Sequence, residues 1–282
     1  MNKAKVPTSA GWLVRRAALS LLRIILLLVI GLALYFRFFE NRLIFYPEPA
    51  LSGSPQLPFE DVHFTAMDGT RLHGWFIPYA ESKRVFIISH GNAGNIGDRV
   101  DMAEFVNKEF ESSVFAYDYR GYGGSEGKPS ESGVYSDLQG ALRYVRSRGY
   151  SPGSIFLIGQ SLGTAVTVHV AAQEPVAGII LEAPFTSARA MARSYMHSLP
   201  FDYFLSARFD SAAHIAKVKA PIAVVHAKRD PVVPFVLGQQ LFEAAPRPKK
   251  FFAVNADLHE GALMAMGLVR TRELRAFLWN VN

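Results

Sequence analysis

The sequence predicts an α/β domain built on a mostly parallel sheet of about eight strands, with helices on both faces, preceded by an N-terminal transmembrane helix. Three observations support this prediction. Short, continuously apolar segments alternate with helical patterns through most of the 282 residues. Half of the residues are apolar and only 19% are charged, as expected for a chain with a large core. A long apolar stretch lies close to the N-terminus.

The expected strands are short segments that are either alternating in polarity or continuously apolar; they are 60–66, 71–77, 84–90, 113–119, 154–159, 177–183, 221–227 and 251–256. The first two alternate in polarity around the turn MDGT and predict a hairpin. The other six are apolar on both faces, which is typical of parallel strands covered by helices. The segment 184–219 is expected to form a small lid over one end of the sheet.

The clearest helical pattern follows Ser130, which is the expected N-cap. Its apolar side chains recur at helical spacing and share one face; they are Val134, Leu138, Leu142 and Val145. This helix is expected to cover the sheet.

The net charge of +6 belongs to the N-terminal segment. Residues 1–42 hold seven basic side chains and a single acidic one, Glu40, so the rest of the chain is neutral. This distribution indicates contact with a membrane surface and argues against nucleic-acid binding. The absence of cysteine excludes disulfides, thiolate metal sites and cysteine nucleophiles.

Residues 17–36 form the expected membrane span. Twenty helical residues rise about 30 Å, enough to cross the hydrocarbon core of a bilayer, and Arg23 can snorkel to the headgroups. Basic residues are more numerous before the span, which predicts a cytoplasmic N-terminus and a catalytic domain outside the cytoplasm, periplasmic in a bacterium. The alternative is a cleaved signal peptide, with Gly31 and Ala33 before the cut.

The expected organisation is therefore a basic segment and anchor (1–42), a linker rich in proline, serine and glycine (43–59), and one catalytic domain (60–282). An anchor is favoured over a cleaved leader because the chain stays apolar and aromatic beyond the candidate cleavage site. The oligomeric state is left open by the sequence.

Two stretches fit the Gly-x-Ser-x-Gly pattern of a serine-hydrolase nucleophile, around Ser125 and around Ser161. A nucleophile elbow needs a buried strand directly before the serine and a helix directly after it, with small residues two positions to either side. Only Ser161, flanked by Gly159 and Gly163, meets these requirements. Ser125 lies in a glycine-rich loop and is not expected to react.

A serine nucleophile needs a base and a carboxylate, which in this kind of domain follow it in the order acid, then histidine. His259 comes shortly after the last strand, whereas His226 precedes the candidate acid and is out of order. Asp230 follows the strand before and is the expected acid; Asp257 is a rival because it lies close to His259 along the chain.

The oxyanion of the tetrahedral intermediate needs two hydrogen-bond donors. The backbone N–H of Leu162 is the first expected donor, and the N–H of Asn92 in the loop HGNAGN is the second. His90 and Gly91 in the same loop are expected to support it. No metal or organic cofactor is needed for this chemistry.

These motifs, HGNAGN, DYRGYGGSEG, GQSLG, DPVVP and His259, occur in an order that resembles the α/β-hydrolase fold serine hydrolases. The likeness covers residues 60–280 and is nearest to the membrane-anchored α/β-hydrolase-domain group, which includes depalmitoylases, acylglycerol lipases and relatives labelled serine aminopeptidase-like. The resemblance implies a triad of Ser161, Asp230 and His259. Lys228, Arg229 and Leu258 depart from the family pattern without removing a reacting group.

The expected activity is hydrolysis of an ester or thioester of an acylated or lipid-like substrate. A serine peptidase using the same residues is one alternative. A non-catalytic membrane protein that keeps the fold as a binding scaffold is the other.

Overall fold

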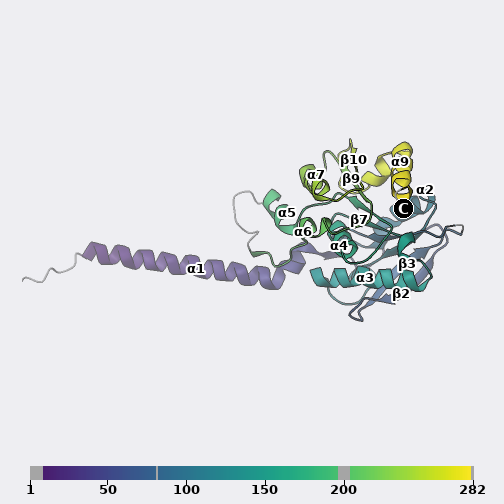
Figure 1. The fold of residues 1–282 in the computed structure, drawn as a ribbon. Helices are drawn as coiled ribbons and strands as arrows, with labels where there is room; N and C mark the ends of the chain where they lie inside the picture. The colour runs from purple at the N-terminus through teal and green to yellow at the C-terminus, as the bar shows by residue number, and fades with distance from the viewer. Residues whose placement is uncertain (1–8, 81, 196–203, 281–282) are drawn as a thin grey trace, which may run out of the picture.

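An eight-stranded sheet forms the centre of the protein, in a computed structural model that describes residues 9–80, 82–195 and 204–280 (Figure 1). Its strands overlap the eight expected segments, with ends that differ by up to two residues. They are β2 (Glu60–Thr65), β3 (Arg71–Ile77), β4 (Val85–Ser89), β6 (Ser113–Tyr117), β7 (Ile155–Gln160), β8 (Gly178–Glu182), β9 (Ile222–Ala227) and β10 (Lys249–Val254).

The strands are arranged in space in the order β10-β9-β8-β7-β4-β6-β3-β2. From β10 to β6 all neighbours are parallel, whereas β3 runs antiparallel to both β6 and β2. The hairpin of β2 and β3 turns at Gly69, whose φ of +89° lies in the left-handed region that glycine tolerates. The prediction of a mostly parallel sheet with one hairpin is confirmed.

Helices cover both faces of the sheet, as predicted. They are α2 (Val100–Glu109), α3 (Glu131–Ser147), α4 (Leu162–Ala171), α5 (Ala188–Tyr195), α6 (Ser211–Ile215), α7 (Phe235–Ala244), α8 (Ala262–Ala265) and α9 (Leu268–Trp279). The core has two parts, one on each face, and successive strand residues alternate between them. Ile87 packs in the part that contains α3 and α4, and Ile88 packs in the part that contains α2 and α9.

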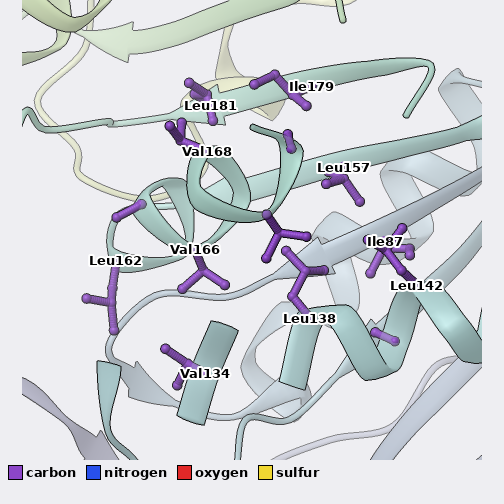
Figure 2. Close-up of a cluster of buried hydrophobic side chains, with 14 of the residues drawn as sticks. Ile87, Val134, Leu138, Leu142, Leu157, Leu162, Val166, Val168, Ile179 and Leu181 are labelled. Atoms are coloured by element: carbon purple, nitrogen blue, oxygen red, sulfur yellow. The ribbon is translucent and has the colours of Figure 1, made fainter. Parts of the chain in front are cut away.

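Helix α3 has the expected apolar face. The side chains of Val134, Leu138 and Leu142 point toward α4 and the sheet, where they meet Val166 and Ile87 (Figure 2). The hydroxyl oxygen of Ser130 accepts a hydrogen bond of 3.2 Å from the backbone N–H of Gly133, so it caps the helix as predicted.

Helix α1 (Ser9–Ile44) projects away from the rest of the protein (Figure 1). Its 36 residues correspond to a length of about 54 Å. The segment Ala10–Ile44 has an apolar window with a mean hydropathy of 2.7 that is not buried inside the protein. By length and composition it is suited to cross a membrane, and a signal sequence would meet the same criteria.

The segment after α1 is fastened to the domain. Strand β1 (Tyr46–Pro47) pairs in parallel with β5 (Ala93–Gly94). Further along, the carboxylate of Glu104 on α2 accepts hydrogen bonds from the backbone N–H groups of Gln56 (2.6 Å) and Leu57 (3.0 Å). The proline-rich composition predicted a linker, and its backbone groups here find acceptors on the surface of the domain.

The lid segment, defined as residues 184–219, contains α5 and α6 and lies near the end of α1 (Figure 1). Residues 196–203 of this segment fall outside the described residues, so the expected lid is described only in part.

Candidate active site

Ser161 lies at the sharp turn between β7, which ends at Gln160, and α4, which begins at Leu162. Its backbone has φ +50° and ψ −115°, a strained conformation for a residue with a side chain. The residue is 8% exposed. The sequence places a buried strand and a helix on either side of this serine, and the turn between them has the geometry of a nucleophile elbow.

The two flanking glycines are required by close approach of the backbone. A Cβ atom at Gly159 would collide with the carbonyl oxygen of Gly163, and one at Gly163 would collide with the carbonyl oxygen of Ser89 on β4. Any larger residue at either position would push β7, α4 and β4 apart. The spacing of the motif therefore has a direct steric cause.

Ser125 has a different surrounding. Its hydroxyl donates a hydrogen bond of 2.8 Å to the carbonyl oxygen of Asp118 and accepts one of 2.9 Å from the backbone N–H of His73. The first contact lies within the loop after β6, and the second holds that loop against β3. The hydroxyl thus joins two backbone segments, and that Ser125 does not react stays a prediction.

Asp230 and His259 meet at the same end of the sheet. Asp230 follows β9 and His259 follows β10, and Nδ1 of the imidazole lies 3.0 Å from Oδ1 and 2.9 Å from Oδ2 of the carboxylate. The carboxylate also accepts hydrogen bonds from the backbone N–H groups of Val232 (2.8 Å) and Val233 (2.9 Å). This pairing orients the ring so that Nε2 points away from Asp230.

The carboxyl group of Asp230 is held in its ionised form. Burial by itself would raise its pKa, but the hydrogen bonds from His226, His259 and the backbone outweigh that effect and lower the pKa well below its usual range. An ionised carboxylate is the form that can stabilise an imidazolium on His259 during a reaction.

The rival acid, Asp257, points elsewhere. Its carboxylate forms an ion pair with Arg229, with 2.9 Å between Oδ2 and Nη2. Arg229 is one of the residues that departs from the family pattern, and here it engages Asp257 on the surface. Of the two carboxylates considered, the structure brings Asp230 to His259.

His226 is a residue whose part the sequence reasoning missed. It is fully buried at the end of β9, and its Nε2 lies 3.1 Å from the carbonyl oxygen of Val233 and 3.4 Å from Oδ2 of Asp230. It therefore contacts the candidate acid at the same carboxylate oxygen, Oδ2, that lies 2.9 Å from Nδ1 of His259. The sequence signal for this contact was a histidine at the end of a strand, four residues before the acid.

The two expected oxyanion donors lie in the loop after β4 and at the start of α4. Among the described residues, neither the backbone N–H of Asn92 nor that of Leu162 has a hydrogen-bond acceptor. The rest of Asn92 is firmly held, because its carbonyl oxygen accepts from the hydroxyl of Tyr122 at 2.7 Å and from the backbone N–H of Tyr46 at 2.9 Å. Both N–H groups are therefore available to a ligand.

His90 braces this loop. Its Nδ1 lies 2.8 Å from the carbonyl oxygen of Gly91, and its Nε2 accepts a hydrogen bond of 3.4 Å from the backbone N–H of Tyr119. Burial lowers the pKa of His90 to about 4, so the ring is neutral at physiological pH. A neutral ring that bridges two backbone segments can support the loop, which is the role expected of His90.

The loop that carries His259 approaches the loop HGNAGN (residues 90–95, called the oxyanion loop below) through Glu260. Its carboxylate forms an ion pair with Arg99 at 2.7 Å. A Cβ atom at Gly91 would lie 3.2 Å from Oε1 of Glu260 and 3.7 Å from Cβ of Ser161, so this glycine sits between the two. Among the described residues, Ser161 and His259 share no hydrogen bond. Catalytic contacts of this kind often tighten only when a substrate binds.

Glu182, a residue that the sequence did not point to, links β7 to α8, the helix that follows the loop with His259. The side-chain amide of Gln160 donates to Oε2 at 2.7 Å, and the backbone N–H of Leu263 donates to Oε1 at 2.8 Å. Burial raises the pKa of this carboxyl group. It lies at the end of β8, beside Ser161, whose own N–H donates to the carbonyl oxygen of Glu182 at 2.9 Å.

A cavity of about 460 Å³ opens at Ser161. Its walls come from α1, the oxyanion loop, the start of α4, the lid segment and the turn after Asp230; the lining residues are Phe36, Leu43, Ile44, Tyr46, Asn92, Ser161, Leu162, Phe185, Ala188, Met191, Ala192, Tyr195, Leu205, Phe209 and Val232. Most of these side chains are apolar, which favours an apolar ligand.

Known proteins resemble this chain in sequence and in fold. Residues 80–206 match the family described as serine aminopeptidase, S33. Protein Rv2307c of Mycobacterium tuberculosis is 34% identical over 270 residues, which cover 94% of this chain and 96% of that protein. Alpha/beta hydrolase domain-containing protein 17C of the mouse is 37% identical over 186 residues, which cover 65% of this chain and 56% of that protein.

Among solved structures, the esterase Pf2001 of Pyrococcus furiosus superposes with a TM-score of 0.69 at 20% identity, covering 84% of this chain and 97% of the esterase. At this identity the likeness shows the fold alone. Together, fold and family define a hydrolase. The chain belongs to the α/β-hydrolase family of serine hydrolases, as the resemblance in its motifs implied.

Proposed function

We propose that the protein is a membrane-anchored serine hydrolase that cleaves an ester or thioester of an acylated, lipid-like substrate through Ser161, His259 and Asp230. The observation that carries the proposal is the pairing of His259 with Asp230 at the sheet end where Ser161 sits in a strained elbow. A packed core requires neither the strain nor a carboxylate paired with the imidazole, and a reaction on an acyl group uses both.

The reaction proceeds in two halves. Oγ of Ser161 bonds to the acyl carbon while its proton passes to Nε2 of His259, and the leaving oxygen or sulfur takes that proton as its bond to the acyl carbon breaks. A water molecule then attacks the acyl-enzyme, gives its proton to His259 and releases the acid, and Ser161 recovers its proton. The N–H groups of Asn92 and Leu162 bind the negatively charged oxygen in both halves.

The apolar cavity at Ser161 supports an acyl chain as the part of the substrate that is recognised. Helix α1 supports a membrane anchor. The excess of basic residues before the span supports a cytoplasmic N-terminus and a catalytic domain on the far side of the membrane. In this proposal residues 1–42 are the anchor segment, residues 43–59 connect it, and residues 60–282 carry the chemistry.

The decisive experiment compares Ser161→Ala with Ser125→Ala, because both serines occur in the same five-residue pattern. The full chain in detergent is assayed with p-nitrophenyl esters and labelled with a fluorophosphonate probe. Ser161→Ala should lose labelling and lower kcat by at least ~10³-fold. Ser125→Ala should keep labelling whenever it remains folded. Unchanged turnover in Ser161→Ala would rule the mechanism out.

A peptidase is a second candidate, favoured by the family description serine aminopeptidase. The same residues can attack an amide, and the difference lies in what the cavity accepts. Cleavage of aminoacyl amides at a higher kcat/KM than any alkyl ester would favour the peptidase. Failure of the probe to label purified, folded protein would instead favour a binding scaffold.

A further inference from the structure

The last turns of α1 lie against the candidate active site. Phe36, Leu43 and Ile44 of this helix line the same cavity as Ser161. Phe36 is 8% exposed, although most of the helix before it is exposed. Its ring stacks on that of Phe204 in the lid segment, with 6.2 Å between ring centroids and 13° between their planes. The helix thus becomes part of the catalytic domain at its C-terminal end.

Backbone contacts hold this end of α1 on the oxyanion loop. The side-chain amide of Asn92 donates a hydrogen bond of 3.0 Å to the carbonyl oxygen of Ile44, the last residue of the helix. The backbone N–H of Tyr46 donates a hydrogen bond of 2.9 Å to the carbonyl oxygen of Asn92. The parallel pairing of β1 with β5 extends the same contact.

A buried carboxylate on α1 holds the lid segment. Glu40 is 3% exposed, and its side chain accepts hydrogen bonds from the backbone N–H groups of Ser206 (3.1 Å) and Ala207 (2.8 Å) and from the hydroxyl of Ser206. This is the single acidic residue of segment 1–42. Through it, the helix and the lid segment enclose the cavity together.

The side of this helix end that faces away from the cavity is exposed and apolar. Leu34 and Phe38, which lie about half a turn from Phe36, are 52% and 73% exposed. The apolar window of the same helix precedes Phe38 along the chain. The cavity therefore lies where the apolar helix enters the domain, and the bilayer would end close to it.

We propose that α1 is a wall of the acyl-binding site, and that the cavity receives a long aliphatic chain of a bilayer-resident ester, which enters alongside this helix. The inference rests on the proposed function and adds the source and length of the acyl group. Each methylene of the acyl chain that is kept out of water along this path should increase the binding constant about fourfold. A tether alone would not need apolar side chains facing the nucleophile.

The test uses the full chain in bilayer vesicles and measures kcat/KM for p-nitrophenyl dodecanoate and p-nitrophenyl butyrate. Phe36→Ala is compared with Phe38→Ala, a matched substitution on the exposed side of the same helix. Leu43→Gln is a second cavity variant at a partly exposed position, which tolerates a polar side chain without disturbing the core.

The ratio of the dodecanoate value to the butyrate value should fall about tenfold or more in Phe36→Ala and in Leu43→Gln, and should stay at the wild-type level in Phe38→Ala. An unchanged ratio in both cavity variants would overturn the inference. So would a wild-type enzyme that hydrolyses butyrate but not dodecanoate, because the proposed hydrolase would then stand without a long-chain site. If the fluorophosphonate probe does not label Ser161 in the wild-type protein, both the proposed hydrolase function and this inference are rejected.

Discussion

His259 and Asp230 are 29 residues apart in the chain, yet Nδ1 of the imidazole lies 2.9 Å from Oδ2 of the carboxylate. The contact forms because β9 and β10 are parallel neighbours, so the loops after them leave the sheet side by side. Two residues on different loops are thereby held at one edge of the sheet, where the turn after β7 also presents Ser161.

Replacing Asp230 by Asn should lower kcat by about 10⁴-fold, because an amide can hold the ring but cannot stabilise the charge that develops on it. Asp257→Asn is the matched control, since that carboxylate is exposed and paired with Arg229. It should change kcat by less than about threefold. Equal losses in the two variants, measured by ester hydrolysis, would contradict the assignment of the acid.

Stability should fall with decreasing pH through the titration range of His90. Its folded-state pKa of about 4 lies below the ordinary value of 6.5. As the pH falls, the unfolded chain therefore binds the proton first. The stability associated with the neutral ring is fully present above about pH 6.5 and is lost progressively down to about pH 4, a change on the order of 3 kcal/mol.

Because buried carboxyl groups titrate in the same range, the test is a difference between variants. The free energy of unfolding is measured in urea at both ends of the window for wild type, His90→Gln and His63→Gln. His63 is exposed on β2 and serves as the control. The pH dependence should become weaker in His90→Gln alone; an identical dependence in all three proteins would refute the assignment.

Glu40→Gln should loosen the lid segment from α1. The carboxylate accepts two backbone N–H groups in a buried position, and the neutral amide binds them less strongly, at a cost of about 1–3 kcal/mol. Limited proteolysis of the full chain should cut the lid segment faster in this variant. Glu48→Gln, at an exposed position just after the helix, should digest at the wild-type rate.

The N-terminal segment should be retained in the mature protein. The apolar helix does not end at the small residues Gly31 and Ala33 but continues to Ile44, as an anchor would. The intact mass of protein from the membrane fraction should therefore include residues 1–33. Ala33→Phe, which blocks cleavage by a signal peptidase, should have the same N-terminus. A wild-type N-terminus at Leu34 that is absent in this variant would establish a cleaved leader instead.

The strands, the hairpin, the helix after Ser130 and the elbow at Ser161 were predictable because each depends on a local pattern. Alternation reports which face of a strand is buried, and glycines at 159 and 163 report a turn too tight for a Cβ atom. The chain order of acid and base pointed to Asp230 and His259 and left Asp257 as a rival. The family assignment follows from the same motifs.

Contacts between distant segments could not be deduced in this way. Asp257 is close to His259 along the chain, but its carboxylate pairs with Arg229. Which of these partners it contacts depends on the positions at which the two loops leave the sheet. The part of His226 was missed for the same reason. The sequence predicts the end of α1 only as an apolar and aromatic continuation of an anchor, yet Glu40 and Ile44 find their partners in the lid segment and in the oxyanion loop. Local periodicity records burial, but a partner far along the chain is selected by the packing of the whole domain.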